Sequence, residues 1–368
     1  MAKVLFLLHM PPPVHGSSMV GEWIHKSELI NNAFDCRYIN MLASRNVSES
    51  GSITVSKLFL FISSLFRFIG KLLKSKPDLC YFALTATGIA FYRDVLFVLI
   101  LKIFRIKHIY HLHNKGVKDA STNKLNNVLY HFVFKNTDVI LLSEYLYPDV
   151  QQYVLKNRIL ICPNGIPSKI LPPKNKSQKK DGIVKILFLS NLIESKGVFV
   201  LLEAMGILKH KDVLFEGLFV GGEGDISEIQ FQQRVNQLNI QEQVHYLGKK
   251  YGTDKEKIFN EADIFAFPTY YSKETFGIVN LEAMQHELPI VSTPEGGIPD
   301  IVHNGINGFL VPPKDSVQLA EKLEKLILNR DLRIKMGKAG KKIYEENYTA
   351  NIFEKRLLQV LLKQIQTD

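Results

Sequence analysis

Short apolar runs and amphipathic stretches alternate along the whole chain. The runs have the length of strands, and the stretches between them place apolar residues at helical spacing. In the first part of the chain, strands are predicted at Lys3–His9, Cys36–Met41, Asp78–Leu84, Lys107–His113, Asp138–Leu142 and Arg158–Cys162. Helices are predicted between them, at Ser17–Ile30, Ser56–Lys74, Gly88–Phe104, Lys124–Lys135 and Glu144–Leu155. This alternation is typical of an α/β fold with a parallel sheet.

The alternation stops at a segment rich in Pro, Lys and Gly and then begins again. Further strands are predicted at Val184–Ser190, Phe215–Val220, Val244–Leu247, Ile264–Phe267 and Ile290–Ser292. Helices are predicted at Gly197–Lys209, Ser227–Leu238 and Asp254–Asn260, around 276–284, and in a terminal set. The sequence therefore predicts two doubly wound, Rossmann-like domains, residues 1–166 and 183–349, joined by a linker at 167–182.

The stretch Lys273–Met284 carries the strongest chemical signal. Glu274 precedes the helix predicted there, and Glu282 lies inside it. The first-turn amides around Phe276, Gly277 and Ile278 lack intrahelical partners, and the helix dipole adds partial positive charge. Such a turn can hold a diphosphate, and Gly277 lets the phosphate approach the backbone.

Two carboxylates on either side of an anion site suit a ligand with hydroxyl groups at both ends, such as a nucleotide sugar. The alternative is a solvated helix start whose Glu residues only complement the dipole. We favour the first interpretation, because glycine-rich turns follow the stretch, at Pro294–Asp300 and Gly305–Val311.

With these flanking turns, the Glu-x7-Glu pattern resembles the signature of the retaining GT-B glycosyltransferases of family four. The resemblance implies two domains facing a central cleft, with a C-terminal helix at about 350–368 crossing back to the first domain. It implies sugar transfer from a nucleotide sugar, a UDP-sugar being favoured over a GDP-sugar, to a glycan or lipid-linked acceptor. Neither a metal nor a cofactor is expected.

The loop Ser190–Gly197 follows the first strand of the second domain. Lys196 there can neutralise a pyrophosphate as a point charge. The family usually has an Arg where this chain has Asn191, which can donate a hydrogen bond but brings no charge. Donor-binding residues are thus expected to be Lys196, Asn191, Thr275, Phe276, Gly277, Ile278, Glu282, Gly16 and Ser17.

In the first domain, alternation along the strand places His111 and His113 on one face, with His113 nearer the carboxyl end. The resemblance implies a histidine near the transferred sugar at this strand end, so His113 is predicted to be catalytic together with Glu274. Gly16 and Ser17 occupy the place of the family's glycine-rich first loop, although Ser17 or Ser18 as a helix N-cap explains the loop equally well.

Composition narrows the class of partners. The net charge of +10 favours anions, and no nucleic-acid-binding motif accompanies it, so a membrane surface is favoured over nucleic acid. The helix Ser56–Lys74 fits a membrane interface, and it fits equally well a helix half buried against the sheet. The three cysteines lie far apart in the sequence, so neither a disulfide nor a zinc site is expected. This suits the reducing cytosol. Neither a signal peptide nor a transmembrane helix is expected.

Other functions remain open. A nicotinamide enzyme is improbable because no G-x-G-x-x-G follows the first strand. For the favoured function, a glycosyltransferase, we expect a front-face mechanism. Glu274 holds the sugar, Glu282 binds the ribose, and the leaving phosphate takes the proton of the acceptor. A sugar-nucleotide epimerase or hydrolase would need a further acid and base near the sugar. A catalytically silent nucleotide-sugar-binding partner is the third alternative, which Asn191 leaves open.

Overall fold

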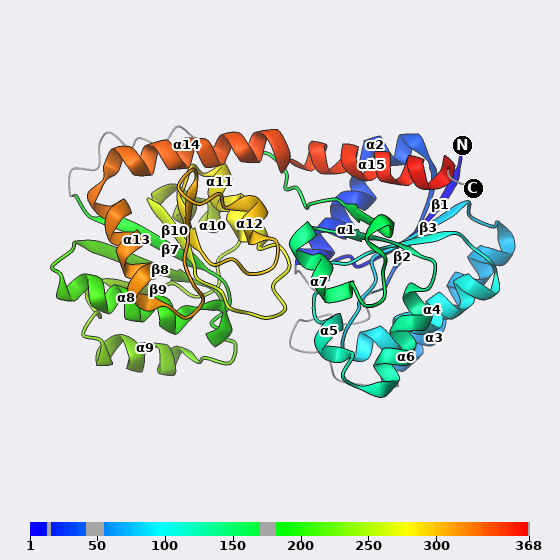
Figure 1. The fold of residues 1–368 in the computed structure, drawn as a ribbon, viewed down its shortest axis with the longest axis horizontal. Helices are drawn as coiled ribbons and strands as arrows, with labels where there is room; N and C mark the ends of the chain where they lie inside the picture. The colour runs from blue at the N-terminus through cyan, green and yellow to red at the C-terminus, as the bar shows by residue number, and fades with distance from the viewer. Residues whose placement is uncertain (13–15, 42–54, 170–181, 367–368) are drawn as a thin grey trace. The chain divides into compact units, whose positions relative to one another are not determined.

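The computed structural model describes residues 1–12, 16–41, 55–169 and 182–366. The chain divides into two units (Figure 1). The first comprises Met1–Gly165 with Ala350–Asp368, and the second comprises Ile166–Thr349. Most of the expected linker, 170–181, lies outside the described residues, as do 367–368 at the end of the expected C-terminal helix.

The first unit contains a parallel sheet in the order β2-β1-β3-β4-β5-β6. Its strands are β1 (Lys3–Leu8), β2 (Asp35–Asn40), β3 (Leu79–Phe82), β4 (His108–His111), β5 (Asp138–Leu141) and β6 (Ile159–Ile161). Val4 to Leu8 are all buried, because β1 lies inside the sheet and helices cover both of its faces. The order reverses between β1 and β3, which defines a topological switch point.

The helices of the first unit are α1 (Gly16–Lys26), α2 (Glu28–Ala33), α3 (Val55–Lys74), α4 (Ile89–Ile103), α5 (Val117–Ala120), α6 (Lys124–Phe134), α7 (Tyr147–Val150) and α15 (Ala350–Gln366). Short 3-10 turns are η2 (Glu144–Leu146) and η3 (Lys156–Arg158). Figure 1 shows α3, α4 and α6 gathered on one side of the sheet.

Two helix predictions in this unit were wrong. The single helix predicted at Ser17–Ile30 is interrupted, because the Ser27 hydroxyl accepts a hydrogen bond from the Ile30 amide (3.3 Å) and so caps a new helix, α2. The helix predicted at Glu144–Leu155 is a 3-10 turn followed by one helical turn that starts at Tyr147–Pro148.

The second unit contains a parallel sheet in the order β12-β11-β10-β7-β8-β9. Its strands are β7 (Val184–Leu189), β8 (Phe215–Val220), β9 (Val244–Tyr246), β10 (Ile264–Phe267), β11 (Ile290–Ser292) and β12 (Gly308–Leu310). Counted from β7, this is the strand order of the dinucleotide-binding fold, with its switch point between β7 and β10. The sequence prediction missed β12, which has only three residues.

The helices of the second unit are α8 (Val198–His210), α9 (Glu228–Gln237), α10 (Gly252–Glu261), α11 (Ile278–Gln285), α12 (Ile298–Ile301), α13 (Ser316–Leu328) and α14 (Arg330–Asn347), with η4 (Glu194–Lys196) before α8. All of them belong to Ile166–Thr349. Both units thus have the expected fold class, a doubly wound parallel sheet.

Helix α15 packs within the first unit, although it ends the chain. Phe353, Leu357 and Leu361 are buried along one face. The Gln364 amide donates to Asp138 (2.7 Å), and the Ser27 hydroxyl donates to Glu354 (2.7 Å). The core of the first unit is therefore completed by residues from the end of the chain.

We predict that Leu361→Ala destabilises the first unit by about 2–5 kcal/mol, because it removes a fully buried side chain. Leu362→Ala is the matched control, since Leu362 is 39% exposed, and we expect it to cost less than about 1 kcal/mol. The only tryptophan in the chain, Trp23, belongs to this unit, so denaturant unfolding followed by its fluorescence reports the change. Equal effects of the two substitutions would contradict the packing of α15.

Candidate functional site

Two loops of the second unit meet at its switch point. The loop after β7 carries Lys196, and the loop after β10 leads through Glu274 to α11. The Tyr270 amide donates to the Ser195 carbonyl (2.7 Å), which joins the loops through their backbones. A β-carbon at Gly197 would lie 2.2 Å from the Pro268 carbonyl oxygen, so only glycine permits this approach.

Lys196 and Glu274 form an ion pair across this contact. The Lys196 Nζ lies 2.6 Å from the Glu274 Oε2, and the two side chains are 15% and 10% exposed. The ammonium group also lies 4.4 Å from the centroid of the Tyr271 ring, a cation–π contact. Burial raises the pKa of the Tyr271 hydroxyl, and the Glu274 carboxylate raises it further. The pair is a largely desolvated charge centre at the carboxyl ends of β7 and β10.

The turn before α11 has the backbone geometry of an anion-binding site. Gly277 has φ +66°, a left-handed conformation that favours glycine, and is the N-cap of α11. The amides of Gly277, Ile278 and Val279 make no hydrogen bond within the described part of the chain. They are the donors that a helix N-terminus offers to a phosphate.

Phe276 and Thr275 contribute to this turn differently from the sequence expectation. The helix begins at Ile278, so Phe276 lies before the first turn. The Phe276 ring is 1% exposed and packs against Tyr348, with 5.9 Å between the ring centroids. The Thr275 carbonyl accepts from the Gly297 amide (2.7 Å). The Phe276 side chain is thus part of the core, and only its backbone is available to a ligand.

The glycine-rich loop after β11 supports the backbone of Glu274. Gly296 has φ +56°, and a β-carbon there would lie 2.4 Å from the Glu274 carbonyl oxygen. The hydrogen bond from Gly297 to Thr275 adds a second link. The Pro294–Asp300 motif therefore positions one of the two carboxylates.

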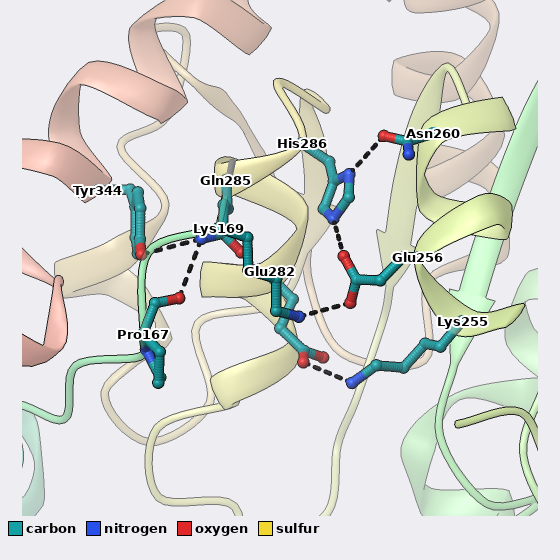
Figure 2. Close-up of polar contacts among 9 residues, drawn as sticks. All are labelled: Pro167, Lys169, Lys255, Glu256, Asn260, Glu282, Gln285, His286 and Tyr344. Carbon is teal, nitrogen blue, oxygen red and sulfur yellow. Dashed lines mark hydrogen bonds and ion pairs between the residues drawn. The ribbon is translucent and has the colours of Figure 1, made fainter. Parts of the chain in front are cut away.

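The second carboxylate, Glu282, is held by α10 (Figure 2). The Lys255 Nζ lies 2.6 Å from the Glu282 Oε1, and the two side chains are 23% and 15% exposed. The sequence analysis missed Lys255, because nothing in the spacing of α10 connects it to a residue 27 positions away. Each carboxylate of the Glu-x7-Glu pattern thus has a lysine partner from another element.

The carboxyl end of α11 is fixed by a further polar cluster (Figure 2). The buried His286 contacts Asn260 through Nδ1 and Glu256 through Nε2, both at 2.9 Å. Lys169 pairs with the other oxygen of Glu256 (2.5 Å). Because Glu256 and Lys255 are adjacent in α10, this helix holds α11 at two points, Glu282 inside the helix and His286 at its carboxyl end.

Asn191, which stands where the resembling family usually has an arginine, is tied to the next strand. Its Oδ1 accepts a hydrogen bond from the Gly222 amide (3.1 Å), so its Nδ2 is the group left to donate to a ligand.

A β-carbon at Gly222 would lie 2.0 Å from the Cε and 3.1 Å from the Nζ of Lys249. A second lysine therefore lies beside the Asn191 loop. The rule that ligands bind at the carboxyl ends of strands could have identified Lys249, which follows β9 closely.

The remaining predicted residues belong to the first unit. The His111 and His113 rings lie on the same side of the chain, 4.1 Å apart, although β4 ends at His111 rather than at His113. The His111 Nδ1 lies 2.6 Å from the Tyr81 hydroxyl. Burial lowers the pKa of His111 well below its ordinary value, and His113 lowers it further. His111 is therefore a neutral, buried support for the more accessible His113.

Gly16 and Ser17 are the first two residues of α1. Ser17 thus lies inside the helix rather than at its N-cap, and Gly16 opens the first turn after β1. Two further observations concern the described residues as a whole. They contain no group of three or more His, Cys, Asp or Glu that could hold a metal ion. No helix among them is long and apolar enough to cross a membrane.

The fold is that of the GT-B glycosyltransferases. A glycosyltransferase from Rickettsia africae ESF-5 superposes with a TM-score of 0.76 at 16% identity, and covers 100% of both chains. Anabaena Alr3699/HepE in complex with UDP and glucose superposes with a TM-score of 0.74 at 18% identity, over 98% of this chain and 99% of that one. At these identities the likeness establishes the fold.

Sequence comparison adds a match to a family of transferases. Residues 172–343, which lie within the second unit, match the model of the family "Glycosyl transferases group 1". The chain is 29% identical over 241 residues to the capsular polysaccharide biosynthesis glycosyltransferase CapM of Staphylococcus aureus, covering 61% of each chain. It is 35% identical over 155 residues to a D-inositol 3-phosphate glycosyltransferase of Corynebacterium jeikeium, covering 41% of this chain and 36% of that one.

We predict that Lys196 and Glu274 are energetically coupled. Lys196→Met leaves a poorly solvated carboxylate, and Glu274→Gln leaves a poorly solvated ammonium. The double variant leaves neither charge behind, so its loss of stability should be smaller than the sum of the losses of the two single variants. A double-mutant cycle measured by thermal unfolding should give a coupling energy of about 1–3 kcal/mol.

The control for this cycle is the pair Lys211–Glu324, which has the same residue types and the same 2.6 Å separation but is 45% and 25% exposed. Its coupling energy should stay below about 1 kcal/mol. Equal coupling in the two pairs would show that burial at the switch point adds nothing.

The Glu256 cluster should make the second unit sensitive to acid. Burial raises the pKa of the Glu256 carboxyl, but the hydrogen bonds and charges of Lys169 and His286 outweigh burial, so the net effect lowers the pKa. A carboxyl group whose pKa is lowered by folding stabilises the folded protein at pH values above the ordinary pKa of glutamate. This stabilisation is lost as the pH falls through the lowered pKa. The stability difference between the wild type and Glu256→Gln should therefore shrink below about pH 4.5.

The measurement is the thermal midpoint of both proteins across the acid range. Glu242→Gln, which changes an exposed carboxylate of the same unit, is the control, and its difference from the wild type should be constant with pH. A difference for Glu256→Gln that is equally constant would refute the role of the cluster.

Proposed function

We propose that the chain is a retaining glycosyltransferase that moves a sugar from a nucleotide-sugar donor to a hydroxyl group of a glycan or lipid-linked glycan. The observation that carries the proposal is the pair of lysine-bound carboxylates, Glu274 and Glu282, on either side of the open amides at the start of α11. The family match of residues 172–343 supports it.

The donor is assigned to this arrangement by chemical complementarity. The Gly277 to Val279 amides and Lys196 bind the diphosphate, since all of them favour negative charge. Glu282 accepts from the ribose hydroxyls, and Glu274 accepts from the hydroxyls of the sugar. Asn191 donates its Nδ2 to the diphosphate, and Lys249 supplies the charge that an arginine at position 191 would bring. A UDP-sugar is favoured over a GDP-sugar, and the complex of the Anabaena neighbour with UDP and glucose supports that preference.

The ion pair of Lys196 and Glu274 must be exchanged when the donor binds. Lys196 turns from Glu274 toward the diphosphate, and Glu274 is released to the sugar, so neither charge is left unpaired in a desolvated place. In the transition state the bond from the anomeric carbon to the phosphate oxygen breaks, and negative charge grows where Lys196 and the amides of α11 lie. The acceptor oxygen forms its bond on the same face, and its proton passes to the departing phosphate. The reaction so written needs neither a metal nor a cofactor.

Gly16, Ser17 and His113 belong to the first unit, and their predicted roles stay predictions. His113 is assigned to the transferred sugar and the amides of Gly16 and Ser17 to the donor phosphate or the acceptor. The name of the S. aureus relative, which refers to capsular polysaccharide biosynthesis, supports a polysaccharide or glycolipid product. A lipid-linked acceptor would place the enzyme in the cytoplasm at the inner face of the membrane.

One observation favours a second candidate. Because Asn191 stands where the resembling family usually has an arginine, the loop after β7 itself carries less positive charge than the family's loop, and the Gly222 amide already occupies Asn191 Oδ1. A nucleotide-sugar-binding partner without turnover would have this character. Product analysis separates the candidates. A glycoside that forms only with an acceptor supports a transferase, and an altered or hydrolysed sugar supports an epimerase or hydrolase. Binding without any product supports a silent partner.

We predict that one nucleotide sugar in a panel of UDP- and GDP-sugars stabilises the folded protein, by about 2.7 kcal/mol when its concentration is a hundredfold above its Kd. Thermal unfolding measures the shift. Glu282→Ala and Lys249→Gln should weaken or abolish it, because they remove a ribose acceptor and a positive charge. Lys211→Gln, on the exposed pair, is the control and should behave as the wild type.

Glu274→Gln should lower turnover by on the order of a hundredfold or more while binding persists, since the amide keeps the shape but loses the charge. His113→Ala tests the residue of the first unit in the same assay. Full turnover by Glu274→Gln would refute its assigned role, and binding of a donor to Glu282→Ala with unchanged affinity would refute the placement of the ribose.

A further inference from the structure

Helix α4 is apolar on the side that faces away from the protein as well as on the side that faces the core. Phe91, Phe97, Val98 and Leu101 are buried. On the opposite side, exposed apolar residues recur at intervals of three and four positions: Ile89, Tyr92, Leu96, Leu99 and Ile103. This spacing forms one continuous stripe along the helix. A stripe of this kind is normally covered.

The neighbouring helices extend the stripe into a surface. On the α6 side, Leu125 and Val128 are 58% and 64% exposed, and the Tyr92 hydroxyl donates to Asn126 of the same helix (2.7 Å). On the α3 side, Phe66 and Leu73 are 70% and 71% exposed.

The helices are joined beneath this surface. Phe68 of α3 packs against Phe97 of α4, with 5.1 Å between the ring centroids. Figure 1 shows the three helices together on one side of the sheet. We call these exposed side chains of α3, α4 and α6 the apolar face.

The charged side chains that α3, α4 and α6 leave at the surface are basic in the described part of the chain. Basic side chains lie on all three helices: Arg67, Lys71 and Lys74 on α3, Lys102 on α4 and Lys124 on α6. The only acidic residue in the sequences of the three helices is Asp94. Asp94 is fully buried, where Arg93 and the Thr85 amide bind its carboxylate. No carboxylate of these helices therefore reaches the apolar face.

We propose that the apolar face is a docking surface for an anionic membrane. Its apolar side chains enter the boundary between headgroups and acyl chains, and the exposed Arg67, Lys74 and Lys124 on the same helices extend to the lipid phosphates. Tyr92 has the amphipathic ring that is enriched at such interfaces. Charge decides against a second copy of the chain, because a symmetric contact through this face would place basic residues opposite basic residues.

Co-sedimentation of the full chain with vesicles tests this proposal. The wild type should bind vesicles of mixed phosphatidylcholine and phosphatidylglycerol, and bind pure phosphatidylcholine much more weakly. The double variant Leu96→Asp/Leu99→Asp should lose about tenfold or more in partitioning. Arg67→Gln/Lys74→Gln should lose about fivefold for each charge removed, and added salt should reproduce this loss.

The control is Ile229→Asp, at an exposed apolar position of α9 in the other unit, which should bind as the wild type does. All substituted positions are exposed, and unchanged thermal unfolding verifies folding. Undiminished binding by Leu96→Asp/Leu99→Asp would overturn the proposal. So would a wild type that ignores vesicles and instead forms a dimer that Leu99→Asp breaks, as detected by sedimentation equilibrium. Stabilisation by nucleotide sugars is a separate readout, so failure here and failure of the proposed transferase are distinguishable.

Discussion

The meeting of the loops after β7 and β10 is the constraint on which the candidate site depends. Lys196 can reach Glu274 only because glycine at position 197 lets the first loop lie against Pro268 of the second. The Ser195 carbonyl accepts the Tyr270 amide at the same place. Adjacent parallel strands bring these loops together, and the strand order that makes β7 and β10 neighbours creates the crevice between their ends. The charges of the site are thus placed by topology and one close backbone contact.

Desolvation explains why the site holds its carboxylates in lysine pairs. A carboxylate as little exposed as Glu274 or Glu282 would be costly without a cation, and a lysine removes that cost while the site is empty of ligand. The same lysines are mobile point charges that can follow a phosphate. In the proposed function, a site built in this way would be stable before a donor binds and would reorganise by exchanging partners rather than by exposing charges. Such an exchange would also make binding depend on the diphosphate and the hydroxyl groups together.

The sequence predicted the fold class and much of the second unit, because buried parallel strands and amphipathic helices have distinct periods. It also placed Glu274 before α11 and Glu282 inside it. Contacts between elements far apart in the chain were beyond its reach, as Lys255 shows: no local pattern in α10 marks Glu282 as its partner. The break at Ser27 was missed for a different reason, since a hydroxyl that caps one helix and a hydroxyl inside a longer helix look alike in sequence.

Helix α4 shows how a local pattern becomes informative only in the fold. A helix that is apolar all round is normally interpreted as buried, and periodicity alone cannot say which side the protein covers. The sheet, α3 and α6 cover the side of Phe91 and Phe97, and the Leu96 side is exposed. A bilayer supplies an apolar medium without requiring a complementary shape, and anionic lipids supply the countercharge that the basic helices need. Apolar surface and uniform charge thus have one explanation, where either feature alone would have several.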